Sequence, residues 1–389
     1  MALRAATARL QLRSLMTGAH IPRGNQPIMN RMKHFDNKQP PIGKQYQQNG
    51  NSILRTIRNG IAIGVAIGVG YYYFMGFERK LPGSIVNTPT QTTIIQDIPD
   101  IKVTREVRYN DDQKADLILF QYPTCPFCCK VRAFLDYFKV SYDIVEVDPM
   151  LKQQISWSTY KKVPILLVKL NDGYIPLTDS TMIISAMATY LKNKTVSIEE
   201  VANYYPSVSF IDADGKRKTD IMNKYFIMNI NENMKAEQLE IDNERKWRQW
   251  SDEVLVHVLS PNAYRTLSEA IDSFKWFSIA GQWEKNFPVW ETTFMIYGGA
   301  FMMWMISKGL KKKYKLKDEV RQSLYDECNV WVKEIRKKGD KFMGGESPNL
   351  ADLAVYGVLS SIEGCAAFSD ACQNTDIKIW YGNMKTALQ

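Results

Sequence analysis

Histidines and paired cysteines are scarce in this chain of 389 residues. It has three histidines, His20, His34 and His257, and six cysteines that contain a single CxxC pattern. A structural zinc site needs four nitrogen or sulfur ligands, usually in two close pairs, and small secreted domains are evenly cross-linked by many disulfides. The sequence therefore predicts no metal site and argues against a secreted disulfide scaffold.

Acidic residues are almost absent from the N-terminal part. Residues 1–59 hold ten Lys/Arg and one acid, Asp36, whereas the other 330 residues carry forty basic and forty acidic side chains. The formal net charge of +9 therefore belongs to this extension. Because the rest of the chain lacks the basic excess that DNA or RNA binding requires, we expect no nucleic-acid partner.

The basic extension (1–59) has the composition of a targeting segment. Its first 35 residues contain no Asp or Glu, and their cationic residues are interleaved with Leu, Ala, Ser and Thr. A mitochondrial presequence is cationic and amphipathic in this way, although an untargeted basic tail has the same charge. We expect a mitochondrial location on this composition; the cationic residues are Arg4, Arg9, Arg13, Arg23, Arg31 and Lys33.

Residues 60–77 predict one transmembrane helix. The segment has eighteen residues without a charge and, at about 1.5 Å per residue, spans roughly the hydrocarbon core of a bilayer. It contains five glycines, each of which would destabilise a helix in water by about 1 kcal/mol relative to Ala. Charged residues on both flanks leave the orientation open. Residues 78–112 then predict a linker, with a strand near 101–107.

Residues 113–193 predict a thioredoxin/glutaredoxin-like domain. One helix begins at Pro126 and another follows Asp179, each with apolar residues on one face. Asn171-Asp172-Gly173 is a turn signal between the last two strands. The order β-α-β-β-β-α is that of a minimal thioredoxin-like fold; the strands are predicted at 115–122, 142–147, 165–170 and 174–177.

Residues 194–389 predict an all-helical domain, so that the fold class is α/β followed by all-α. This part holds eight of the nine tryptophans, and no run in it predicts a strand. Residues 292–307 are uncharged, but Gly298-Gly299 interrupts this short segment. We therefore expect a buried helix of the domain there rather than a second membrane span.

Cys125-Pro126-Phe127-Cys128 stands where the first strand ends and the first helix begins. Free N–H groups and the dipole of a helix N-terminus lower the pKa of a thiol placed there. Pro126 suits the first helical turn, where a missing N–H does no harm. Although CxxC can also be half of a zinc site, its place at this corner predicts a reactive thiol, with Cys125 as the nucleophile. We expect Cys129 to be a packed side chain.

Three further positions have both a structural and a functional interpretation. Val163-Pro164 precedes a strand, where thioredoxin-like folds place a cis-proline opposite the reactive cysteine and leave the preceding backbone free for a peptide-like ligand. Asp179-Ser180 is a plain helix N-cap or the place where a helix start binds the carboxylate of glutathione. Asn349-x-x-Asp352 is a capping arrangement, which we expect to be structural.

Longer stretches closely resemble the membrane-associated prostaglandin E synthase 2 family. The resemblance covers most of residues 100–385 and implies a glutaredoxin-like domain followed by a glutathione-transferase-like helical domain, usually in a homodimer. One departure is Cys129, where we expect a small polar residue such as Ser. The segments are FQYPTCPFCCKVRAFLDYF, YKKVPILLV, LTDSTMIISAMATYL, ERKWRQWSDEVLVHVLSPNAYRT and PNLADLAVYGVL.

The resemblance implies isomerisation of prostaglandin H2 to prostaglandin E2, with glutathione and haem bound. Carried over by motif, Cys125 is the catalytic thiol with Cys128 as its partner, and Tyr122 and Phe127 line the substrate pocket. The residues that would hold glutathione are Val163, Pro164, Asp179 and Ser180. The residues do not identify a haem ligand, since His257 lies in a helical run typical of a packed side chain. The resemblance implies instead that the glutathione thiol meets the iron.

The residues leave other functions open. A CxxC at this corner also suits a glutaredoxin-like thiol–disulfide oxidoreductase, with Cys128 as the resolving thiol, and a membrane-tethered haem- or glutathione-binding protein without turnover is a third possibility. In the isomerase, we expect Cys125 to engage the oxygen on carbon 11 while the hydrogen on carbon 9 is removed by a base that the sequence does not identify. The resemblance also implies a Golgi membrane location and a clipped soluble form as alternatives to the mitochondrion.

Overall fold

The computed structural model describes residues 93–389, apart from 97, 99–100, 111–115, 212–216 and 229–234. The predicted extension at 1–59, the predicted transmembrane helix at 60–77 and the first part of the predicted linker lie outside the described residues. Among the helices that are described, none combines the length and the apolarity needed to cross a membrane.

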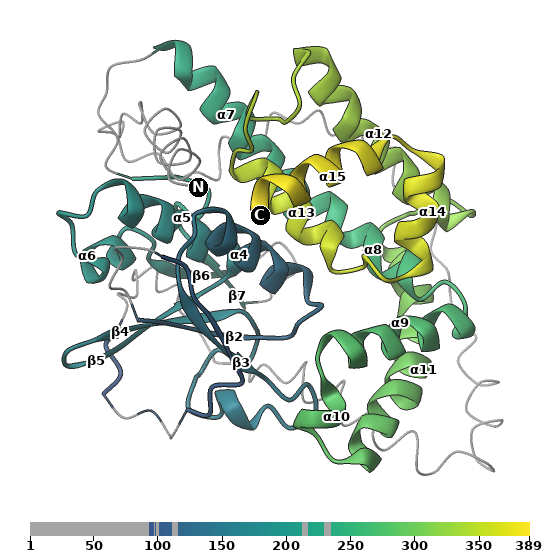
Figure 1. Cartoon of the computed structure of the whole chain (residues 1–389), viewed down its shortest axis with the longest axis horizontal. Coiled ribbons are helices and arrows are strands. Elements are labelled where there is room, and N and C mark those ends of the chain that lie inside the picture. The colour runs from purple at the N-terminus through teal and green to yellow at the C-terminus, as the bar shows by residue number, and fades with distance from the viewer. Residues whose placement is uncertain (1–92, 97, 99–100, 111–115, 212–216, 229–234) are drawn as a thin grey trace. The chain divides into compact units, whose positions relative to one another are not determined.

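A five-stranded sheet organises the first domain (Figure 1). Its strand order is β1-β3-β2-β4-β5; β2 and β3 are parallel, and the other neighbours are antiparallel. Apart from β1, which lies in the predicted linker, this is the predicted thioredoxin-like order. The strands are β1 (Arg105–Val107), β2 (Leu117–Gln121), β3 (Tyr142–Glu146), β4 (Ile165–Leu170) and β5 (Gly173–Thr178).

The two faces of the sheet are buried by different partners. Leu117 and Leu119 of β2 join a large apolar core with the helices α4 (Pro126–Tyr137) and α5 (Ser180–Lys192). Phe120 belongs to a smaller cluster with Cys128, around which partly buried aromatic residues pack. Because strand side chains alternate between faces, the same strand closes the main core and leads the chain to the CxxC corner.

The turn between β4 and β5 has the predicted place and residues. Leu170 pairs with Gly173, so that Asn171 and Asp172 form the two-residue loop. Gly173 has a φ of 149°, and a Cβ atom there would lie 2.7 Å from the carbonyl oxygen of Ile95. Glycine is therefore required by both the backbone conformation and the close approach of the neighbouring chain.

Helices dominate the second domain, as predicted. Its centre holds Trp331, which is 0% exposed and has ring contacts with Trp247, Trp250 and Trp380. The helices after α5 are α6 (Ile198–Asn203), α7 (Lys235–Trp250), α8 (Val256–Ala263), α9 (Leu267–Ala280), α10 (Trp283–Asn286), α11 (Val289–Lys313), α12 (Val320–Lys338), α13 (Leu350–Ser360), α14 (Ala366–Asn374) and α15 (Ile377–Leu388). A 3₁₀ turn, η4 (Gln153–Ile155), precedes β4, and a π turn, η5 (Ser251–Leu255), joins α7 to α8.

The prediction of no strand beyond Lys194 is wrong. A two-stranded antiparallel hairpin, β6 (Ser207–Ile211) and β7 (Arg217–Ile221), lies between α6 and α7. The residues of β6 are half-buried or exposed and alternate between serine and apolar side chains. A short strand of this kind lacks the continuous apolar run by which buried strands are recognised.

The prediction of a buried helix at 292–307 is only partly correct. These residues belong to α11, in which one face contains the buried Thr292, Met295, Ala300 and Ser307. The opposite face exposes large side chains, including Trp290, Phe294, Tyr297, Phe301 and Met305. One face of α11 is therefore buried and the other exposed, although apolar side chains occur on both.

Candidate functional site

The helix α4 begins at Cys125 without a capping side chain. Cys125 has extended backbone angles, Pro126 occupies the first turn, and no Ser, Thr, Asn or Asp side chain caps this helix start. The N–H of Cys125 itself donates to the carbonyl of Tyr122 at 3.2 Å, which closes the turn that follows β2. The N–H groups at the start of α4, which carry the positive end of the helix dipole, are therefore left to stabilise a negative charge on the Cys125 sulfur.

This environment favours the thiolate of Cys125. The pKa of Cys125 is lowered, first by a hydrogen bond from the Cys128 thiol, and further by the backbone N–H groups of Cys128 and Phe127 and the positive charge of Arg132; burial opposes these effects. The side chain is partly exposed. A thiolate that is accessible and held by donors is the reactive form of cysteine.

Cys128 has the opposite character. It is 0% exposed, and its pKa is raised well above the usual value, first by burial and then by its hydrogen bond with Cys125 and the charge of that residue. Cys128 therefore keeps its proton and donates it toward Cys125. The two cysteines therefore differ in protonation, with the proton held at Cys128 and the thiolate favoured at Cys125.

The sheet brings the predicted ligand residues to the same end as Cys125. Phe120 of β2 pairs with Ile165 of β4, and Ile165 pairs with Thr178 of β5. The residues that follow β2, precede β4 and follow β5 are therefore neighbours at one edge. This edge holds Cys125, the cis Val163–Pro164 bond and Asp179.

Val163 and Asp179 differ in whether their polar groups are already hydrogen-bonded within the protein. Within the described residues, the backbone of Val163 makes no main-chain hydrogen bond. Asp179 caps α5, because its Oδ1 accepts from the N–H of Thr181 at 2.8 Å and of Met182 at 3.2 Å. Ser180 is 4% exposed. The structural interpretation of Asp179 is thus confirmed, while its second carboxylate oxygen is not used by this cap.

The aromatic residues predicted beside the thiol lie close to it. Tyr122 is partly buried and packs with Cys125 around the smaller apolar cluster. Phe127 follows Pro126 and is 37% exposed. An apolar ring on each side of the thiol in sequence suits a hydrophobic substrate.

Two tyrosines that the sequence analysis did not identify also approach the thiol. The pKa of Tyr160 is raised, first by burial and then by the charges of Asp179, Cys125 and Cys128. The pKa of Tyr264 is raised by burial and then by the charges of Cys365 and Cys125. Both phenols keep their protons at neutral pH. Tyr160 stands three residues before Val163 in YKKVP, which is the one signal that could have drawn attention to it.

A buried polar network joins α4 and α5 to the helical domain. Lys130, 1% exposed, donates to the hydroxyl of Thr181 at 2.8 Å and forms an ion pair with Asp252 of the π turn η5. Asp252 also accepts from Thr181 at 2.6 Å and from Tyr225 at 3.1 Å. The helices that carry Cys125 and Asp179 are therefore tied to the same carboxylate.

Cys129 is a packed side chain, as predicted. It is 4% exposed, and burial raises its pKa. Its sulfur donates to the carbonyl of Pro123 and accepts from Arg132 at 3.1 Å. It borders a cavity of about 280 Å³ on the far side of the 123–125 turn, together with Arg105, Arg132 and Trp276.

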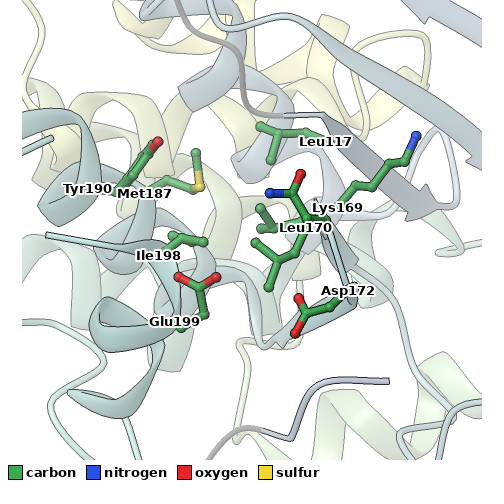
Figure 2. Close-up of a pocket in the computed structure, with 10 residues that line it drawn as sticks. Leu117, Lys169, Leu170, Asp172, Met187, Tyr190, Ile198 and Glu199 are labelled. Carbon is green, nitrogen blue, oxygen red and sulfur yellow. The ribbon is translucent and has the colours of Figure 1, made fainter. Parts of the chain in front are cut away.

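A second cavity of about 280 Å³ lies away from these residues. Its walls include the apolar Leu117, Leu170, Met187 and Ile198, and Asp172 and Glu199 add two carboxylates (Figure 2). It lies between the β4–β5 hairpin and the helices α5 and α6, and none of the predicted site residues borders it. We therefore assign the site to the thiol edge of the sheet.

Two further predictions concern structural residues. Asn349 and Asp352 form a capping box at the start of α13, as predicted. His257 lies flat on Tyr314, with 4.1 Å between the ring centroids. Among the described residues, no group of three or more His, Cys, Asp or Glu side chains could hold a metal ion.

Comparison with known proteins gives the following similarities. A family model described as Glutaredoxin matches residues 117–170. The chain is 46% identical over 283 residues to prostaglandin E synthase 2 of Danio rerio, covering 72% of each chain. It is 45% identical over 278 residues to prostaglandin E synthase 2 of Mus musculus, covering 70% of each.

Solved structures with a similar chain include a glutathione S-transferase and a beta-etherase. Glutathione S-transferase III in its apo form has 14% identity and a TM-score of 0.39, covering 71% of this chain and 94% of that one. The beta-etherase LigF from Sphingobium sp. strain SYK-6 has 15% identity and a TM-score of 0.40, covering 70% and 96%.

Proposed function

Because this chain belongs to the prostaglandin E synthase 2 family, we propose that it isomerises prostaglandin H2 to prostaglandin E2 with Cys125 as the essential group. The observation that supports this proposal is the start of α4. A partly exposed thiol with a lowered pKa lies there beside a buried thiol with a raised one.

The isomerisation moves one proton and needs no external oxidant or reductant. In our proposal the Cys125 thiolate takes the proton from carbon 9, and the electrons of that C–H bond form the carbonyl at carbon 9. The weak O–O bond breaks, its electron pair goes to the oxygen on carbon 11, and the Cys125 thiol returns its proton to that oxygen. The base left open by the sequence is then Cys125 itself.

Other residues of the site would support this transfer. The Cys128 thiol stays protonated and stabilises the Cys125 thiolate between turnovers. Tyr160, which keeps its proton and packs around the same apolar cluster as Cys125, would in our proposal donate a hydrogen bond to the developing alkoxide. Tyr122 and Phe127 supply apolar walls for the hydrocarbon part of the substrate.

Glutathione fits the residues at this edge of the sheet. The backbone of Val163 is free of main-chain partners within the described part of the chain, and a peptide-like ligand can pair with it. The unused oxygen of Asp179 suits an ammonium group. When bound, glutathione would supply a second thiol for exchange reactions, and the isomerisation described above does not require it.

The described residues do not identify a haem site. His257, the one histidine among them, lies flat on Tyr314, and its pKa is lowered, first by burial. We assign no protein ligand for the iron in this part of the chain. The glutathione thiol as iron ligand is an implication of the family resemblance alone, and no step is assigned to haem.

The proposal is tested by product analysis with the full chain and two matched variants. Cys125→Ser should lower the yield of prostaglandin E2 at least a hundredfold, whereas Cys128→Ser should retain most of it. With wild-type protein, deuterium on carbon 9 of the substrate should slow turnover, because that C–H bond breaks. An unchanged yield with Cys125→Ser contradicts the proposal.

A second candidate function is glutaredoxin-like thiol–disulfide exchange. It is favoured by the buried, protonated Cys128 beside the Cys125 thiolate, which is the arrangement of a resolving thiol, and by the match to the glutaredoxin model over residues 117–170. The same variants separate the two functions. A dithiol exchange activity collapses in Cys128→Ser, whereas isomerisation persists.

We further propose that residues 60–77 anchor the chain in a membrane, that residues 1–59 direct it to mitochondria, and that it works as a homodimer. The support is the acid-free, arginine-rich start, the uncharged segment and the family resemblance. Imaging a C-terminally tagged full chain against one that lacks residues 1–35 tests the targeting. If both colocalise with the Golgi, the targeting proposal is wrong; sedimentation of the purified full chain tests the dimer.

A further inference from the structure

The turn between β2 and α4 is supported from behind by the side chain of Arg132. Its Nη2 donates to the carbonyl of Pro123 at 2.6 Å and to the sulfur of Cys129 at 3.1 Å, and its Nη1 donates to the side-chain oxygen of Gln121. These acceptors belong to the end of β2, to the turn itself and to the first turns of α4. One guanidinium thus connects the elements on both sides of Cys125.

None of these three acceptors carries a formal charge. The nearest anionic groups have other donors: Glu146 accepts from Gln121 at 2.9 Å, and Asp136 accepts from the hydroxyls of Tyr109 and Tyr142. Arg132 has no ion pair among those of the described residues. Its positive charge is therefore not paired with a carboxylate at contact distance; it acts over a distance on Asp136 and Glu146 and also on the Cys125 thiol.

Arg321, in the helical domain, has partners of the opposite kind. Arg321 is buried, with 4% of its side chain exposed, whereas Arg132 is partly buried; Arg321 is paired with Glu269 at 3.0 Å and with Asp370 at 2.7 Å. It further donates to the carbonyl of Asn262 at 2.6 Å. The helical domain thus has a buried arginine with its charge neutralised by neighbours, while the thiol edge has an arginine whose partners are neutral.

We propose that Arg132 is a positioning residue for the reactive thiol: by holding Pro123, Gln121 and Cys129 together, it fixes the turn that presents Cys125 at the start of α4. The proposal rests on the proposed function in that Cys125 is the reactive group. An arginine suits this place because its planar guanidinium directs its donors at fixed angles, whereas the ammonium of a lysine is a compact charge on a flexible stem. Arg132 does not contact the reacting atoms in this proposal.

Several ionisable groups surround Cys125 and Arg132, and each must be held constant in a test. Around the thiol they are Cys128 and Cys129 on α4, Tyr160 before β4, and Tyr264 at the end of α8. Around the guanidinium they are Asp136 on α4, Tyr142 and Glu146 on β3, and Arg105 and Glu363 at the cavity. Among these groups, Glu363 accepts from Tyr381 and Lys385.

The test is the pH profile of Cys125 alkylation by iodoacetamide, followed at the Cys125 peptide by mass spectrometry in the full chain. Arg132→Gln removes the charge and part of the fork, so the midpoint of the alkylation profile should move to higher pH by about one unit. Arg132→Lys keeps the charge without the fork. Its alkylation should stay within about threefold of wild type while kcat for the isomerisation falls about tenfold.

Arg321→Gln is the matched control. It loses a buried guanidinium, so it should lower the melting temperature, but the alkylation profile of Cys125 should not change. Alkylation in Arg132→Gln that matches wild type, with only a lower melting temperature, overturns the proposal. If Arg132→Gln does not fold, Arg132→Lys decides: an unchanged kcat in that variant overturns it.

The alkylation measurement keeps this proposal distinct from the proposed function. Should wild-type chain make no prostaglandin E2, the isomerase proposal fails, while a shifted alkylation profile in Arg132→Gln still supports the positioning role. Should wild type be active and the profile of Arg132→Gln stay unshifted, only the positioning role fails.

Discussion

The helices α4 and α13 pack closely against each other but begin in opposite ways. They approach so nearly that a Cβ atom on Gly357 of α13 would lie 2.4 Å from the Cα of Lys130 on α4. The start of α13 is closed by its own side chains, since Asn349 accepts from the N–H groups of Ala351 and Asp352. The start of α4 has no capping side chain and holds a thiol instead.

The difference shows that the N-terminus of a helix can contribute to stability, as in α13, or to the reactivity of a side chain, as in α4. A helix start whose N–H groups are satisfied by Asn or Asp gains about 1 kcal/mol and has no donors left for chemistry. A start that lacks such a cap gives up this stabilisation, but its donors then lower the pKa of a sulfur placed there. The start of α5 is intermediate, because Asp179 caps it and still faces the site.

The largest effect on stability should come from removing the cap at the start of α13. Asp352 is 0% exposed, and its carboxylate accepts from the N–H groups of Met343, Gly344 and Asn349 and from the indole of Trp380. Asp352→Ala leaves these buried donors without an acceptor, so unfolding should require about 3 kcal/mol less free energy. Urea denaturation measures this.

The control for this prediction is Asp376→Ala. Asp376 stands at the start of α15 without a capping bond, and its side chain is about half exposed, at 54%. The loss in that variant should stay below about 1 kcal/mol. Equal losses of stability for the two variants would mean that the cap of α13 contributes no more than a side chain at an exposed helix start.

The next largest effect concerns the two thiols of α4. Cys125 has a lowered pKa and is partly exposed, whereas Cys129 is buried with a raised pKa. At pH 7 iodoacetamide should therefore modify Cys125 at least ten times faster than Cys129, because the thiolate is the reactive species.

The pH dependence follows from the direction of the shift. As pH rises, the rate at Cys125 should increase and level off below the pH at which an unperturbed thiol with a pKa of about 8.5 does so. The extra thiol at position 129 should therefore not complicate labelling below that range. Comparable rates at both residues would show that the open helix start does not select its sulfur.

A smaller loss is expected when one member of the capping box is removed. Asn349→Ala takes away the acceptor for two N–H groups of α13 but leaves the carboxylate of Asp352 in place, so stability should fall by about 1 kcal/mol. Thermal unfolding of the full chain measures this. Combining it with Asp352→Ala should give less than the sum of the two losses, because both act on one helix start; a fully additive pair would contradict a shared capping unit.

The smallest effect, a gain in stability, should come from adding a capping side chain at the start of α4. Cys125→Asp supplies the carboxylate that α4 lacks, and the free energy of unfolding should rise by about 0.5 kcal/mol. Prostaglandin E2 formation should disappear in the same variant. Cys125→Ala is the control, since it removes the thiol without adding an acceptor, and it should not be more stable than wild type.

Much of the thiol edge could be predicted from the sequence because its signals are local. Pro126 and Cys125 mark a helix start directly after an apolar strand, and Asn171-Asp172-Gly173 marks the turn that brings β5 back along β4. These features depend on the conformational preferences of a few adjacent residues. The hairpin β6–β7 escaped prediction because its residues are half exposed and carry no buried run.

Other parts of the site could not be predicted because they depend on which elements pack together. Tyr264 lies more than a hundred residues from Cys125, and nothing in NAYRT indicates that it approaches a thiol. The sequence also does not show that Asp252 joins α4 to α5, since that contact depends on a π turn between two helices. The exposed face of α11 was likewise hidden, because apolar residues occur all around that helix.

The sequence by itself determined the order of strands and helices within residues 113–193, the position of the thiol at a helix start and the capping residues of α5 and α13. These follow from backbone preferences and from the period at which apolar residues recur. Only the tertiary structure decided that Arg132 has neutral partners while Arg321 is paired with carboxylates. Charge, burial and hydrogen bonding at a side chain depend on groups that the fold brings from distant positions, and a single sequence does not state these distances.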